Sequence, residues 1–137
     1  MSEKLPNIHY KYALALEDGG KFQEAEEEFI EAGKPKEAIS MYIHAREWEK
    51  AEAVAEKYDK NSLPDVLLAQ AKNVMDRENP SAIESLLLRA QKPEMLIKYY
   101  QDNDMWVDAL RICKEYLPSK LSAIQSMYDR QVGSKGN

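Results

Sequence analysis

Cysteine, glycine and long apolar runs are scarce in this chain of 137 residues and 15.8 kDa, and each scarcity excludes a class of structure. A single cysteine, Cys113, cannot form a disulfide within the chain, which favours a reducing compartment. Only five glycines and few β-branched residues disfavour sandwiches, barrels and doubly wound sheets. No run of about 18 apolar residues occurs and residues 1–10 lack an apolar signal core, so neither a transmembrane segment nor a secretory leader is predicted.

Positive charge is also in short supply. The chain has 19 basic and 24 acidic residues, a net charge of −5, and no basic cluster. This balance argues against nucleic acid and anionic lipid as the main partners. Apolar residues make up 44 % of the chain, which predicts one folded domain with a buried core.

The sequence also lacks the motifs of catalytic, metal-binding and phosphate-binding sites. His9 and His44 have no second metal ligand three or four residues away, and Cys113 has no candidate base. The carboxylates of residues 24–28 point in different directions around one helix, so they indicate a solvated face rather than a cation site. Gly19-Gly20 lacks the spacing of a phosphate-binding loop. We therefore expect no enzyme activity, metal, cofactor or small-molecule substrate.

Apolar residues recur every three or four positions along most of the chain, which predicts an all-α fold. Gly, Pro, Asn and Asp residues interrupt this pattern at regular intervals. The predicted helices are 6–18, 21–32, 35–45, 48–58, 63–77, 81–90, 93–102, 105–116 and 119–130.

An internal repeat organises these helices. Residues 29–58 align on residues 87–116 without a gap, so that position 29 falls on position 87 and position 58 on position 116. The identical pairs include Tyr42/Tyr100, Trp48/Trp106 and Ala51/Ala109. Residues 1–132 are therefore expected to form one helical-repeat fragment, with four-helix units at about 5–58 and 63–116, a truncated third unit at 119–130 and a frayed tail at 133–137. A fixed period of short helices is typical of an α-solenoid.

The sequence predicts two sets of residues with distinct roles, one in packing and one in binding. Small and aromatic side chains at the helix crossings are expected to pack the repeats together: Phe22, Ala25, Ala38, Tyr42, Trp48, Ala51, Tyr100, Trp106 and Ala109. Apolar residues that the packing stripes do not require form a candidate protein-binding surface: Met41, Tyr99 and Met105.

Residues 33–38, Gly-Lys-Pro-Lys-Glu-Ala, and residues 108–114, Asp-Ala-Leu-Arg-Ile-Cys-Lys, carry a resemblance that extends over residues 5–130. This stretch resembles the C-terminal helical-repeat region of the largest subunit of intraflagellar transport complex B. The resemblance implies a right-handed α-solenoid of tetratricopeptide-like antiparallel hairpins. It also implies a non-enzymatic scaffold for cilium assembly, located in the cytoplasm and in the cilium or flagellum and its base, whose partners are other protein subunits of a transport complex. Each hairpin is shorter than the usual tetratricopeptide repeat of about 34 residues, so consensus ligand positions are not transferred.

Two alternative functions remain open at this point. One is a segment of a vesicle-coat-like solenoid, which would assemble at a membrane. The other is a co-chaperone-like repeat domain that binds a peptide carboxylate through convergent Lys, Arg and Asn side chains. In the first hairpin the inner positions hold Tyr12, Ala15 and Leu16 instead, which disfavours the co-chaperone.

Overall fold

The computed structural model describes the backbone of residues 4–76 and 79–136, and the side chains of residues 7–76 and 79–133. This part of the chain is helical and contains no strand, so the predicted all-α class is confirmed. No helix within it is both long enough and apolar enough to cross a lipid bilayer. The chain divides into two compact units, Met1–Val74 and Met75–Asn137.

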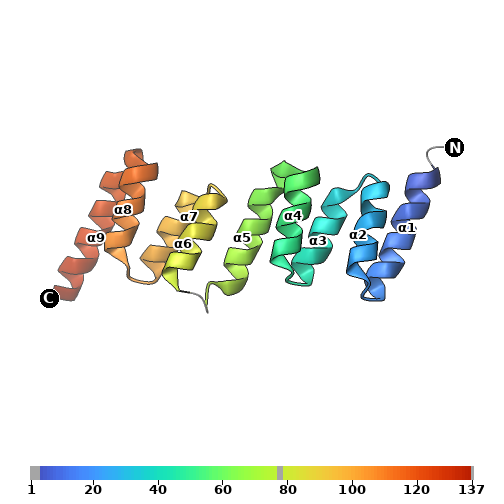
Figure 1. Cartoon of the computed structure of the whole chain (residues 1–137). Helices are drawn as coiled ribbons and strands as arrows, with labels where there is room; N and C mark the ends of the chain where they lie inside the picture. The colour runs from blue at the N-terminus through green and yellow to red at the C-terminus, as the bar shows by residue number, and fades with distance from the viewer. Residues whose placement is uncertain (1–3, 77–78, 137) are drawn as a thin grey trace. The chain divides into compact units, whose positions relative to one another are not determined.

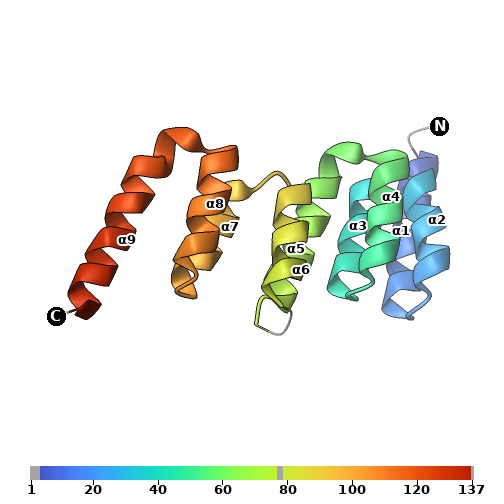
Figure 2. The same cartoon turned by 60° about the vertical axis from the view of Figure 1, so that its left-hand side comes forward.

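The first unit is built from antiparallel neighbours. Its elements are α1 (Lys4–Asp18), α2 (Phe22–Glu31), α3 (Pro35–His44), α4 (Trp48–Tyr58), the short 3-10 turn η1 (Lys60–Ser62) and α5 (Leu63–Val74). The helices α1 and α2 form one hairpin and α3 and α4 form the next, as Figure 1 and Figure 2 show. Since α5 packs against both α4 and α3, it belongs to this unit.

The second unit repeats this arrangement with fewer helices. Its elements are α6 (Pro80–Arg89), α7 (Pro93–Asp102), α8 (Trp106–Tyr116), the 3-10 turn η2 (Pro118–Lys120) and α9 (Leu121–Gly136). Each helix packs against the next, and the contact between α7 and α8 is the most extensive of the unit. The side chain of Asn79 caps α6 by accepting a hydrogen bond of 2.8 Å from the backbone N–H of Ala82.

One backbone motif recurs at helix ends. The residue after the helix cap has a positive φ angle at Gly20, Gly33, Arg46, Gln91 and Asp104. At the second of these, Gly33 N–H donates to Ile30 O at 2.9 Å and Lys34 N–H donates to Phe29 O at 2.9 Å, the two bonds of a Schellman motif. The motifs of the first unit are equally spaced along the chain. Each turn therefore reverses the chain direction, and the antiparallel helices between the turns are of similar length.

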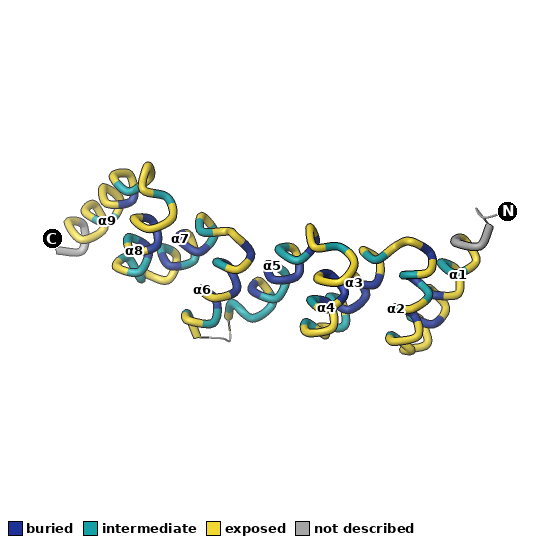
Figure 3. The backbone as a smooth tube through the Cα atoms, turned by 45° about the horizontal axis from the view of Figure 1, so that its top comes forward, coloured by how far each residue is buried: buried dark blue, intermediate teal, exposed yellow. Residues whose placement is uncertain are grey.

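Small side chains fill the narrow space between helices. Ala25, Ala38 and Ala51 are fully buried in the first unit, where they belong to one apolar core with Phe29. In the second unit Ala109 and Cys113 occupy fully buried positions on α8. Figure 3 shows buried segments recurring along the helices, with exposed segments between them. Small residues at these positions let the helix backbones approach closely while the core stays densely packed.

Several boundaries differ from the sequence-based prediction, most of them by one or two residues. The repeat places the start of a new unit at residue 63, but the compact units divide after Val74 because α5 packs against α3 and α4. The helix predicted over 63–77 ends at Val74. The backbone of α9 runs helically through Gly136, Asn137 lies outside the described residues, and the fraying of residues 133–137 stays a prediction.

Candidate protein-binding surface

The three residues predicted to bind a partner occupy different environments. Met41 lies on α3 with only 2 % of its surface exposed, in the core of the first unit, so its predicted exposure is wrong. Its neighbours Ile39 and Tyr42 are also buried, because α3 is covered by both α2 and α4. Tyr99 on α7 and Met105 just before α8 are partly exposed, and their binding role stays a prediction.

Tyr99 lines a shallow cavity of about 270 Å³ in the second unit. Met75 and Met95 also line this cavity, as do Lys98 and Asp102, which form an ion pair of 3.6 Å. The ring of Tyr99 also lies against that of Tyr100, with 5.6 Å between the centroids. Apolar side chains bordered by charged ones are the usual make-up of a small protein-binding patch.

The predicted packing residues lie at or near the core. The five alanine and tyrosine positions Ala25, Ala38, Tyr42, Ala51 and Tyr100 are at most 2 % exposed, and Ala109 is fully buried. Phe22, Trp48 and Trp106 are partly buried at the first residue of their helices. The indole of Trp106 stacks on Tyr128 of α9, with ring centroids 6.0 Å apart.

A tyrosine–glutamate hydrogen bond joins α3 to α2 in the first unit. The hydroxyl of Tyr42 donates to Oε1 of Glu26 at 2.6 Å. Burial of the ring is the main cause of a raised pKa at Tyr42, and the hydrogen bond to Glu26 raises that pKa further. The phenol therefore stays neutral and keeps its proton for this bond, which satisfies the one polar atom of an otherwise apolar side chain.

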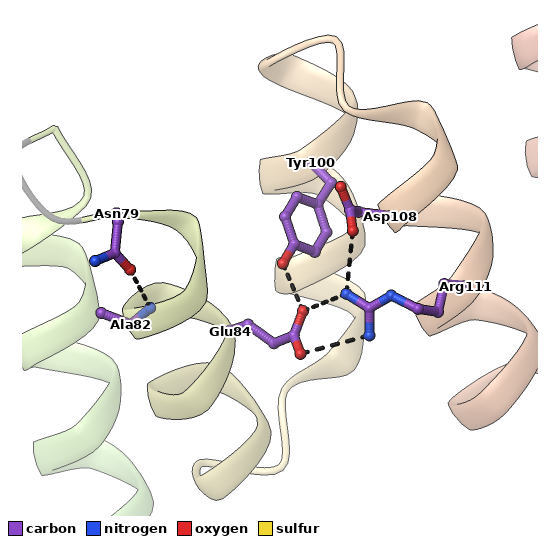
Figure 4. Close-up of polar contacts among 6 residues, drawn as sticks. All are labelled: Asn79, Ala82, Glu84, Tyr100, Asp108 and Arg111. Carbon is purple, nitrogen blue, oxygen red and sulfur yellow. Dashed lines mark hydrogen bonds and ion pairs between the residues drawn. The ribbon is translucent and has the colours of Figure 1, made fainter.

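The same bond joins α7 to α6 in the second unit, and a guanidinium is added to it. The hydroxyl of Tyr100 donates to Oε1 of Glu84 at 2.5 Å, and Arg111 on α8 donates to the same oxygen at 2.6 Å. Arg111 also forms an ion pair of 3.2 Å with Asp108. Figure 4 shows these side chains converging from three helices. The hydrogen bond from Arg111 is the main cause of a lowered pKa at Glu84.

The sequence repeat pairs Tyr42 with Tyr100 but does not by itself reveal their carboxylate partners. Glu26 and Glu84 occupy equivalent positions of the repeat, just before the aligned residues 29–58 and 87–116, so the sequence does contain a sign of this pair. It is obscured because residues 24–28 form an almost uniform acidic run. In the structure that run is not simply solvated, since Glu26 bonds Tyr42 and Oε2 of Glu28 lies 2.5 Å from Nδ1 of His9.

The residues considered for chemistry do not converge. His44 is exposed at the end of α3, and Cys113 is buried with its Sγ 3.2 Å from the carbonyl oxygen of Leu117. Burial raises the pKa of the Cys113 thiol, which disfavours the thiolate needed of a nucleophile. Within the described residues, no three His, Cys, Asp or Glu side chains are grouped to hold a metal ion.

Comparison with known proteins gives a consistent set of relatives, although no protein-family model matches the chain. The chain is 54 % identical over 137 residues to the intraflagellar transport protein 172 homolog of Danio rerio, and 49 % identical over 136 residues to that of Homo sapiens. It is 47 % identical over 122 residues to intraflagellar transport protein 172 of Chlamydomonas reinhardtii.

These alignments cover 100 %, 99 % and 89 % of the chain but only 8 %, 8 % and 7 % of the relatives. The chain therefore spans less than a tenth of the length of the curated relatives that it matches. Similarity of this extent to proteins of three such different organisms supports the resemblance to an intraflagellar transport subunit. From end to end, this chain is similar to one short segment of intraflagellar transport protein 172.

Proposed function

We propose that this chain is a protein–protein interaction segment of an intraflagellar transport subunit, and that it acts as a non-enzymatic scaffold required for cilium assembly. The subunit is the largest of complex B and the segment belongs to its C-terminal repeat region. Its partners are other protein subunits of the transport complex. It works in the cytoplasm and in the cilium or flagellum and its base.

The similarity to intraflagellar transport protein 172 along the whole chain is the observation that carries this proposal. The helical hairpins support it, because short antiparallel helices joined by a repeated turn offer long surfaces for protein partners. We further propose that the hairpins continue as a right-handed α-solenoid of tetratricopeptide-like form. Neither the vesicle-coat nor the co-chaperone alternative gains support from the relatives.

The proposal is tested by placing Tyr99→Glu together with Met105→Glu in the full-length protein, in ciliated cells that lack their own copy. Both side chains are partly exposed, so the fold should survive, which circular dichroism of the segment would check. We expect reduced co-purification of transport subunits and shorter cilia, because aromatic and apolar side chains that are buried by a partner carry much of the energy of an interface.

Tyr58→Glu is the matched control, since it makes the same change at a tyrosine of the first unit that is 42 % exposed at the end of α4. It should restore cilia as well as the unaltered protein does. Normal co-purification with the double variant would exclude the Tyr99 surface. Co-purification of vesicle-coat subunits in place of transport subunits would contradict the proposed function as a whole.

A further inference from the structure

A groove in the first unit opens where three helices meet. Trp48, the first residue of α4, forms one side of it, and Ile43 and His44 at the end of α3 form another. Ala69, Lys72 and Asn73 on α5 complete a cavity of about 460 Å³, with Arg46 contributed by the turn between α3 and α4. The groove therefore combines an indole, an aliphatic wall, an imidazole and two cationic groups, Arg46 and Lys72.

A matching groove is present in the second unit. Its volume is about 440 Å³, and it is lined by Trp106, Met127, Arg130 and Gln131. The sequence repeat that pairs Trp48 with Trp106 also pairs the α5 residues of the first groove with the α9 residues of the second: Ala69 with Met127, Lys72 with Arg130 and Asn73 with Gln131. The Trp48 groove is therefore not an irregularity of one surface but a feature that the repeat builds twice.

The two grooves differ in charge. His44 and Arg46 of the first groove are replaced by Asp102 and Asp104 at the equivalent positions of the second unit. There, Asp104 accepts a hydrogen bond of 3.1 Å from the indole N–H of Trp106. In the first groove, His44, Arg46 and Lys72 make no side-chain hydrogen bond or ion pair with any residue that the structure describes.

The unit that carries this groove is acidic in its overall composition. Residues 1–74 contain 15 acidic and 10 basic residues, while residues 75–137 contain 9 of each. The exposed side chains of Glu47 and Glu49 flank Trp48 along the chain but do not line the groove. A broad anionic surface, such as a membrane or a nucleic acid duplex, is disfavoured by the net negative charge of the unit, whereas a narrow chain can contact the groove residues alone.

We propose that the Trp48 groove binds an acidic peptide segment of a partner protein. An apolar side chain of that segment lies against Trp48 and Ile43, and its carboxylates pair with the cations of the groove. This inference rests on the proposed function, because it names the class of partner that such a scaffold takes at this position. Tryptophan and arginine are among the residues most enriched where binding energy concentrates, and both line this groove.

The probe is a fluorescein-labelled peptide of four glutamates, one leucine and four glutamates, titrated with the chain and followed by fluorescence anisotropy. Arg46→Gly with Lys72→Gln should weaken its binding by about tenfold or more, because two close charge pairs are removed. Since Arg46 has a φ angle of 61°, glycine should also stabilise the fold at this position. A loss of binding by a variant that is no less stable cannot be attributed to unfolding.

Two matched controls are available in the same chain. Lys50→Gln with Lys57→Gln removes the same number of cations from α4 outside the groove, and Arg130→Gln removes the cation of the second groove. Each should leave the affinity within about twofold. Trp106→Phe leaves Trp48 as the sole tryptophan, and binding of the peptide should then change the fluorescence emission of Trp48.

Equal losses in the groove variant and the Lys50/Lys57 control would overturn the proposal, as would equal binding of a peptide with glutamine in place of glutamate. Binding of polyuridine or phosphatidylserine vesicles through the same residues, without binding of the peptide, would also overturn it. Absence of peptide binding with normal co-purification of transport subunits would remove this inference and leave the proposed function standing.

Discussion

At the scale of single residues, the most unusual feature is a left-handed backbone at side chains other than glycine. Arg46, Gln91 and Asp104 have φ angles of 61°, 59° and 60° in turns where Gly20 and Gly33 stand elsewhere. A side chain in this conformation costs roughly 1–2 kcal/mol, because its β-carbon approaches the following carbonyl. This strain is tolerated because the turn reverses the chain direction between two antiparallel helices.

Glycine at these positions should stabilise the protein. Gln91→Gly and Arg46→Gly should each raise the free energy of unfolding by about 0.5–1 kcal/mol, after the larger entropy of glycine in the unfolded chain is subtracted. Thermal melts should show Tm higher by a few degrees. Gly33→Ala, at a φ angle of 73° with no heavy atom within 4 Å of the added carbon, should lower Tm through strain alone. An unchanged or lower Tm for both glycine variants would refute this account of the turns.

The carboxylate of Glu84 gives the second unit a defined response to acid. The hydrogen bond from Arg111 holds the pKa of Glu84 below its ordinary value of 4.5. Because the unfolded chain binds that proton at higher pH, the stabilisation is complete above pH 4.5 and is lost as the pH falls through the lower folded pKa. Urea melts between pH 6 and pH 3 should show less acid sensitivity in Glu84→Gln and in Arg111→Leu. If the free energy of unfolding falls equally with pH in the unaltered chain and in both variants, the contacts of Glu84 contribute nothing to the pH dependence of stability.

At the scale of helices, close crossings depend on alanine. Ala51 on α4 and Ala109 on α8 are fully buried at equivalent positions of the repeat. Ala51→Trp and Ala109→Trp should each lower the free energy of unfolding by about 1–3 kcal/mol or more, because the indole has no space in a packed crossing. Chemical denaturation would measure the change, and Ala53→Trp at an exposed position of α4 is the control. A tryptophan at 51 or 109 that leaves stability unchanged would show that these helices are not closely packed there.

How much of this can be predicted from the sequence depends on the range of the interaction. Glycine, proline and the spacing of apolar residues act locally, and they predict most helix ends closely. Met41 is predicted on the wrong face because its burial depends on α2 and α4 together, which a single helical stripe does not reveal. The partners of Tyr42 and Tyr100 escape prediction for another reason, since Glu26 is one of several carboxylates in residues 24–28 and its repeat pairing with Glu84 does not stand out.

The Trp48 groove could not be predicted either. Its two cations, Arg46 in the turn after α3 and Lys72 on α5, lie far apart along the chain and form no basic cluster in the sequence. Only the comparison of the two folded units pairs Lys72 with Arg130 and Trp48 with Trp106 as groove residues. A repeat detected in the sequence therefore gains functional meaning when its copies are compared position by position, because the differences between copies identify where one surface has changed.

At the scale of the whole molecule, the central claim is that this segment contributes protein-binding surface to an intraflagellar transport subunit. The measurement that tests it most directly is affinity purification of the full-length protein from ciliated cells, with chemical cross-linking and mass spectrometry. We predict cross-links between lysines of this segment, such as Lys72 and Lys98, and other subunits of the transport complex. Lysines of this segment that cross-link only within their own chain, or to vesicle-coat subunits, would contradict the claim.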